Sequence, residues 1–125
     1  MKIKCSLRMI LAGVSLVLMS ACATSPRSGP AALAGTWTNS LGTVWTMKAD
    51  GTFEVMNPKR HIWGKYTVAG DTVTIQETGG KTAKGCKGPG TYKFSRPNEN
   101  TLTFTEVSDT CNERKKNVLL AWHQK

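Results

Sequence analysis

The sequence is poor in the residues from which catalytic and metal sites are usually built. Its 125 residues include two histidines and eight acidic residues, against 17 lysines and arginines. His61 and His123 stand at no ligand spacing to a cysteine, no CxxC pair is present, and no serine lies in a nucleophile-elbow motif. We therefore expect a protein that is not an enzyme, with no catalytic residues, no metal site and no cofactor.

Long apolar runs are also missing, which excludes a permanent membrane-spanning helix on sequence grounds. The longest run, residues 9–19, has 11 residues, whereas a spanning helix needs about 20. It follows the basic residues Lys2, Lys4 and Arg8, as the apolar region of a signal peptide does. We expect residues 1–21 to be a signal peptide that is removed.

The residues after this run are small and end in a cysteine. Residues 19–22 read Met-Ser-Ala-Cys, which resembles the lipobox of bacterial lipoproteins, although leucine is more usual than Met19. The resemblance implies that Cys22 carries a diacylglycerol and that residues 22–33, rich in Ala, Ser, Pro and Gly, are a flexible linker. It also implies a location in the cell envelope. Because no Asp follows the cysteine, the location is the outer membrane facing the periplasm if the host is Gram-negative. The alternative is a plain secretory signal cut at the Ala-x-Ala-like site of residues 21–23.

The charge of the mature chain indicates its partners. Losing Lys2, Lys4 and Arg8 takes the basic count from 17 to 14 against 8 acidic residues, a net charge of +6. We expect a membrane partner through the lipid anchor, and contact with anionic lipid head groups or envelope polymers. Nucleic acid is not expected, because the chain carries no recognition motif and is exported.

Two cysteines remain for the domain once Cys5 leaves with the signal peptide and Cys22 is lipidated. An even pair in an oxidising compartment predicts a disulfide between Cys86 and Cys111. A metal site built on these two cysteines is the competing interpretation, and the missing histidine ligands disfavour it.

Residues 34–125 alternate between apolar and polar side chains and are interrupted by Gly, Asn, Asp and Pro, which is typical of consecutive β-strands. The pattern predicts an all-β domain, a small antiparallel up-and-down barrel of about eight strands joined by short turns. The predicted strands are residues 35–38, 43–48, 52–56, 62–68, 72–77, 90–95, 101–107 and 118–124.

Five segments of the domain resemble the lipocalin-like (calycin) barrels of bacterial lipoproteins. They are the G-x-W segment at residues 33–37, then residues 49–53, 64–73, 90–94, and the closing stretch 102–114. This resemblance implies that Trp37 closes one end of the barrel and that Arg114 stacks on it.

The resemblance and the aromatic interior together predict a non-enzymatic protein that binds a small apolar or amphipathic ligand. Two other functions stay open: a periplasmic inhibitor of lysozyme or of a metalloprotease, acting through the loop at residues 79–90, and a structural protein that contacts the envelope. The predicted ligand-binding residues are Trp37, Trp45, Tyr66, Tyr92, Phe104 and Trp122.

Overall fold

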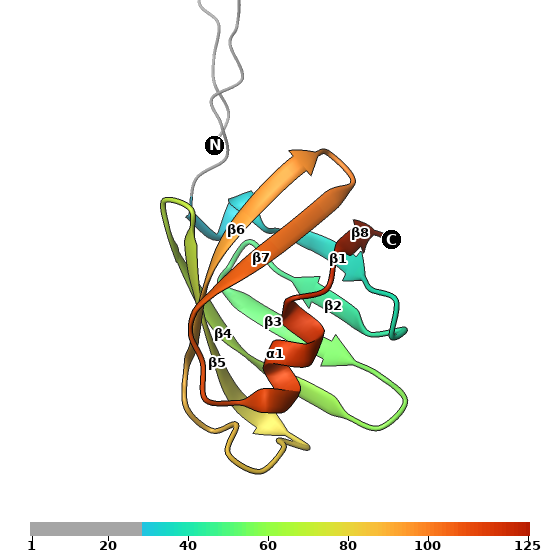
Figure 1. Cartoon of the computed structure of the whole chain (residues 1–125), viewed down its shortest axis with the longest axis vertical. Coiled ribbons are helices and arrows are strands. Elements are labelled where there is room, and N and C mark those ends of the chain that lie inside the picture. Colours follow the sequence, from blue (N-terminus) through green and yellow to red (C-terminus); the bar gives the residue numbers. More distant parts are fainter. Residues whose placement is uncertain (1–28) are drawn as a thin grey trace, which may run out of the picture.

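The computed structural model describes residues 29–125. The predicted signal peptide (1–21), the predicted lipidation site Cys22 and the first part of the predicted linker (22–28) lie outside the described residues. The described chain begins with a short 3-10 helix, η1 (Gly29–Ala32) (Figure 1). The strands are β1 (Gly35–Thr38), β2 (Val44–Met47), β3 (Thr52–Met56), β4 (His61–Ala69), β5 (Thr72–Gly80), β6 (Gly90–Asn98), β7 (Thr101–Ser108) and β8 (Trp122–Gln124), and the helix α1 (Asn112–Val118) lies between β7 and β8.

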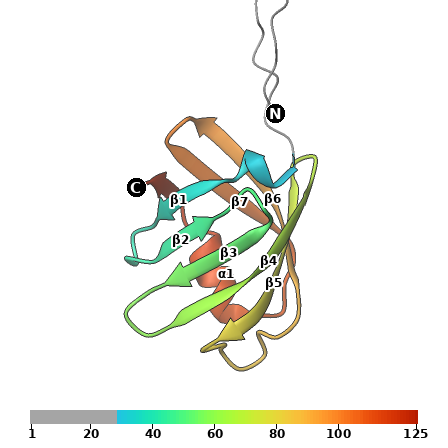
Figure 2. The same cartoon turned by 180° about the vertical axis from the view of Figure 1, so that it is seen from behind.

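The eight strands form a closed antiparallel barrel in which each strand pairs with the next and β8 returns to β1 (Figures 1 and 2). The predicted eight-stranded up-and-down barrel is therefore confirmed. Tight turns make this topology possible: Gly51 and Gly70 sit in hairpin turns with φ of 87° and 60°, a conformation that glycine adopts without strain. β8 closes the barrel with two residue pairs to β1 and two to β7.

The nine-residue strands β4 and β5 bury alternate side chains over much of their length, as the period of two in the sequence predicts. Their register shifts between Trp63 and Gly64. A Cβ atom at Gly64 would overlap the backbone oxygen of Gln76 on β5. Glycine at this position therefore lets the two strands approach each other at the irregularity.

The interior of the barrel is filled mainly by aromatic and branched side chains. Trp45 contacts Trp122 and Phe104, with ring centroids 5.1 and 5.5 Å apart. Edge-to-face and tilted contacts of this kind stabilise a core beyond the burial of area alone. The main cluster is Leu33, Trp37, Trp45, Met47, Phe53, Tyr66, Val73, Ile75, Tyr92, Leu102, Phe104, Val118 and Trp122.

The last strand is shorter than predicted, because residues 112–118 form the helix α1 and β8 begins only at Trp122. The prediction of a strand over 118–124 was wrong for residues 118–121, of which Val118 ends the helix. The local reason is a capped start: the sulfur of Cys111 accepts a hydrogen bond from the Arg114 backbone N–H. Acidic Glu113 in the first turn and basic residues in the last turn also match the helix dipole.

One end of the barrel, the closed end, is covered by η1 and by the residues that follow it. The indole N–H of Trp37 donates to the carbonyl of Leu33 at 3.1 Å, and the hydroxyl of Tyr66 donates to the carbonyl of Pro30 at 3.0 Å. The guanidinium that stacks on Trp37 is that of Arg96, 5.1 Å from the ring centroid. The predicted stacking of Arg114 on Trp37 was therefore wrong.

The position of these two arginines explains the correction. Arg96 lies on β6 close to η1, where its guanidinium also donates to the carbonyls of Ala32 and Glu99. Arg114 lies on α1, and its guanidinium forms an ion pair with Asp109 instead.

Within residues 29–125, no helix has the length and apolar character needed to cross a bilayer.

Candidate binding site at the open end of the barrel

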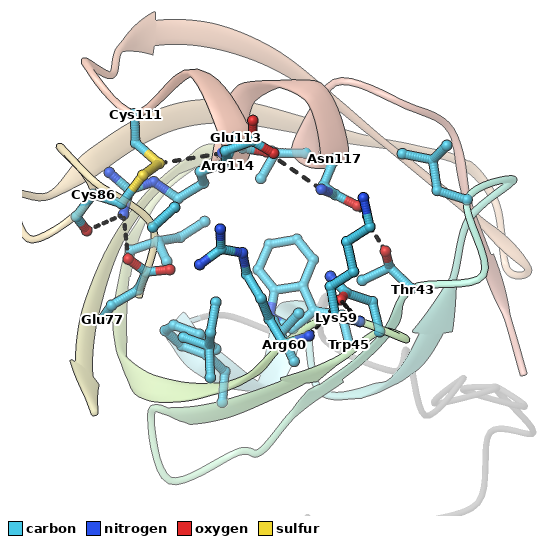
Figure 3. Close-up of a pocket in the computed structure, with 18 of the residues that line it drawn as sticks. Thr43, Trp45, Lys59, Arg60, Glu77, Cys86, Cys111, Glu113, Arg114 and Asn117 are labelled. Carbon is cyan, nitrogen blue, oxygen red and sulfur yellow. Dashed lines mark hydrogen bonds and ion pairs between the residues drawn. A yellow bond between two sulfur atoms is a disulfide. The ribbon is translucent and has the colours of Figure 1, made fainter. Parts of the chain in front are cut away.

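A cavity of about 320 Å³ opens at the end of the barrel opposite η1, which we call the open end (Figure 3). Its mouth is bordered by the β1–β2, β3–β4 and β5–β6 loops and by α1. The apolar side chains that line it are Leu41, Trp45, Phe53, Val55, Ile62, Ile75, Ala83, Val118 and Trp122. The polar and charged side chains that line it are Thr43, Asn57, Lys59, Arg60, Glu77, Glu113, Arg114 and Asn117, together with the disulfide of Cys86 and Cys111 and with Pro58.

The short helix α1 carries one wall of this cavity. Its two buried side chains, Arg114 and Val118, lie one turn apart and therefore share the face that points to the barrel. Asn117 faces the opposite side of the mouth, where its side-chain oxygen accepts a hydrogen bond from the Thr43 hydroxyl at 2.7 Å. These contacts fix the helix across the open end of the barrel.

Arg114 is held in place by a buried carboxylate. Its Nε and Nη2 atoms donate to the two oxygens of Asp109 at 2.6 and 2.7 Å. Asp109 also accepts hydrogen bonds from the Tyr92 hydroxyl and from the Cys111 backbone N–H. Burial alone would raise the pKa of the Asp109 carboxyl, but the hydrogen bonds from Arg114 and Tyr92 hold that pKa below its usual value.

Glu77 is the second carboxyl group near Arg114, and it is less well satisfied. Its side chain is 8% exposed, and its Oε2 atom lies 3.7 Å from Nη1 of Arg114, beyond hydrogen-bond distance. Burial raises the pKa of the Glu77 carboxyl, and the charge of Arg114 only partly opposes this. Figure 3 shows the Glu77 carboxyl directed toward the interior of the cavity.

Two buried side-chain atoms lack a hydrogen-bond partner in the part of the chain that the structure describes: Oε2 of Glu77 and Nε1 of Trp45. Both residues line the cavity. Buried polar groups in folded proteins are nearly always paired, so each unpaired one calls for a partner such as a water molecule, an ion or a ligand. These two atoms are therefore the chemically distinctive feature of the cavity wall.

Lys59 and Arg60 extend from the β3–β4 loop into the opening (Figure 3). The side chain of Asn57 shapes this loop by accepting hydrogen bonds from the backbone N–H groups of both residues, at 2.9 and 2.8 Å. Arg60 also donates to the carbonyl of Lys81 in the β5–β6 loop, at 3.0 Å. The mouth of the cavity is therefore cationic.

The predicted disulfide between Cys86 and Cys111 is confirmed. It joins the β5–β6 loop to the residue that caps α1, and both cysteines are buried. Two walls of the mouth are thus covalently linked.

Among the described residues, no group of three or more His, Cys, Asp or Glu side chains is placed to hold a metal ion.

Only part of the predicted ligand-binding set lines the cavity. Trp45 and Trp122 lie in its wall. Tyr92 and Phe104 belong to the packed core, where Tyr92 contacts Phe104 edge-on. Trp37 and Tyr66 are buried at the closed end, under η1.

The sequence reasoning missed the polar residues of the site, and Glu77 most clearly. One signal was present, because the inward positions of β5 run Val73, Ile75, Glu77, which places a carboxylate where an apolar residue is expected. Arg114 and Asn117 carried no such signal, because the helix that presents them was not predicted.

A search of protein-family models, of curated proteins and of solved structures found no match to this chain.

Proposed function

We propose that this protein is a non-enzymatic binding protein that holds one small amphipathic ligand in the cavity at its open end. The observation that carries the proposal is the cavity itself, which has an apolar floor and a polar, cationic mouth. Ligand sites are typically concave and mostly apolar, with a few polar groups that orient the ligand. This cavity has that composition.

The size of the cavity agrees with a small ligand. At about 320 Å³, it lies at the lower end of the range for ligand sites, roughly 300 to 1,000 Å³. It is also about twice the ~150 Å³ that suffices for one benzene ring in an apolar cavity. A small aromatic molecule or one alkyl chain fits this volume.

The cellular setting is part of the proposal. Lipidation of Cys22 would anchor the protein in the cell envelope, at the outer membrane facing the periplasm in a Gram-negative host. The described chain begins at η1 on the closed end, whereas the β3–β4 and β5–β6 loops lie at the far end (Figure 1). An anchor at Cys22 would therefore connect to the domain on the side away from the mouth. Replacement of Cys22 by Ser would abolish incorporation of labelled palmitate, and labelling that persists in this variant would contradict the anchor.

The binding function is tested by titration with N-phenylnaphthylamine, an uncharged apolar dye, and by native mass spectrometry of the purified protein with its disulfide intact. We expect saturable dye binding. The substitution Val55→Trp, which fills the cavity from β3, should weaken it about tenfold or more. Val107→Trp is the matched control, because Val107 is 54% exposed on β7 and does not line the cavity. Equal dye binding by both variants would contradict the proposal.

A second function, contact with an anionic envelope polymer, is favoured by the exposed lysines of the β5–β6 loop. Lys81, Lys84 and Lys87 are all exposed beside the cationic mouth. Binding to purified lipopolysaccharide that disappears at high salt, and in a variant with Gln at these three positions, would support it. Salt-independent binding would argue against it.

A further inference from the structure

One carboxyl group in the wall of the cavity, that of Glu77, lacks an adequate partner. We propose that Glu77 binds a nitrogen of the ligand, and that the ligand class is small amphiphiles carrying a primary amine on an apolar body. This inference rests on the proposed function, to which it adds the chemistry of the ligand's polar end.

The first step of the argument is the charge balance of the wall. The Nε and Nη2 atoms of Arg114 donate to the two oxygens of Asp109, and Nη2 also donates to the carbonyl of Gly88 at 2.9 Å. Its remaining nitrogen, Nη1, lies 3.5 Å from the carbonyl of Cys86 and 3.7 Å from Glu77. One guanidinium thus faces two buried carboxyl groups, and Asp109 accepts the two shortest of its four side-chain hydrogen bonds.

The second step is what Glu77 lacks. The side chain is 8% exposed, so water compensates its charge poorly. The other nearby cation, Arg60, lowers the pKa of Glu77 less than Arg114 does, and its guanidinium donates to the carbonyl of Lys81 instead. An ammonium group supplies both missing features, a positive charge and several N–H donors.

The third step is the position of the apolar body. Ile75 precedes Glu77 by two residues on β5 and faces the same cavity, whose lining also includes Trp45 and Trp122. A chain or ring attached to an amine at Glu77 can therefore lie against these side chains. An anionic head group at the same depth would be repelled by Glu77 and would remain at the mouth, near Lys59 and Arg60.

The test uses three probes with the same tail, namely octylamine, octanol and octanoate, each titrated calorimetrically into the purified protein at neutral pH. We expect octylamine to bind about tenfold or more tightly than octanol, as for a charge-assisted hydrogen bond, and octanoate to bind less tightly than octylamine. In Glu77→Gln the preference for the amine over the alcohol should be lost.

Glu113→Gln is the matched control. Glu113 also lines the cavity, but its side chain is 56% exposed and pairs with Lys116 at 3.6 Å. The substitution removes the same charge from the same cavity and should leave the amine preference intact. A loss of the amine preference in both variants would show that removing any negative charge from the cavity has this effect, and would overturn the role of Glu77.

The outcomes separate this inference from the proposed function. If octanol binds but octylamine binds no more tightly, or if octanoate is preferred, the cavity is a ligand site and the inference about Glu77 is wrong. If none of the three probes and no N-phenylnaphthylamine binds, the proposed function fails, and the inference fails with it. The comparison of probes on the wild-type protein needs no variant, so it does not depend on how Glu77→Gln folds.

Discussion

Replacing Asp109 by Asn tests whether the buried carboxylate holds the helix-bearing wall of the cavity in place. The Asp109 side chain is fully buried, and it receives two hydrogen bonds from Arg114, one from Tyr92 and one from the Cys111 backbone. Asparagine keeps the shape and can still accept from Tyr92 or Cys111. It removes the negative charge, and so leaves the Arg114 guanidinium without its main partner.

The expected magnitude follows from these contacts. Removing one partner of a buried ion pair typically costs about 3 to 5 kcal/mol, because the other charge remains buried and unpaired. Glu77, already 3.7 Å from Arg114, can take over part of that role. We therefore expect Asp109→Asn to lower the free energy of unfolding by about 3 kcal/mol at neutral pH, the lower end of that range.

The assay is urea denaturation at neutral pH with the disulfide intact, followed by far-ultraviolet circular dichroism. The dependence of the unfolding free energy on urea should keep its slope, so that the shift in midpoint reports stability. Asp71→Asn is the control, because Asp71 is an exposed turn residue whose carboxylate accepts only a long hydrogen bond from Thr72, at 3.3 Å. The reasoning is refuted if Asp109→Asn costs less than about 1 kcal/mol, the effect of an ordinary substitution.

Three further predictions concern the same domain. Replacing Cys86 and Cys111 together by Ala should lower the unfolding free energy by about 3 kcal/mol, because the bond spans 25 residues; unchanged stability in urea would contradict this. The raised pKa of Glu77 means that its carboxyl favours the folded state when protonated, so this contribution is fully present below the unfolded pKa and is lost as pH rises through the folded pKa. The stability of Glu77→Gln should therefore exceed that of the wild type at neutral pH and the two should converge toward pH ~4, and parallel pH profiles would rule the assignment out. Arg96→Ala should lower stability by roughly 0.5 to 2 kcal/mol through loss of the stack on Trp37, and an effect equal to that of Lys93→Ala, an exposed neighbour on β6, would show that the stack contributes nothing.

The sequence pattern predicted most strands because their burial alternates along the chain. β3 was predicted with the bounds that the structure has, since Phe53 and Val55 face inward on either side of the outward Glu54 and turns flank the strand. The same rule failed at residues 118–124. Val118, Leu120 and Trp122 also alternate, yet the capped turn at Cys111 favours a helix that already buries Val118.

The site was harder to predict than the fold because it depends on which long-range contacts form. Arg114 was predicted to cover Trp37, whereas the fold places Arg96 of β6 over that ring and beside Ala32 of η1. The cavity depends on α1 and the β5–β6 loop meeting over the open end, which periodicity along a strand does not encode. Glu77 was the exception, since a carboxylate at an inward strand position could be seen in the sequence.

The brief pairing of β8 makes it the seam of the barrel. Its three residues, Trp122–Gln124, pair with β1 on one side and with β7 on the other and so close the barrel. Without them the barrel would be an open sheet with unpaired edges on β1 and β7. Two backbone hydrogen bonds reinforce the seam, from Gln124 to the carbonyl of Asn100 and from Lys125 to that of Thr36. Exposed edges recruit strands from other molecules, so loss of this short segment would convert a closed barrel into an open sheet that can join edge to edge with its own copies.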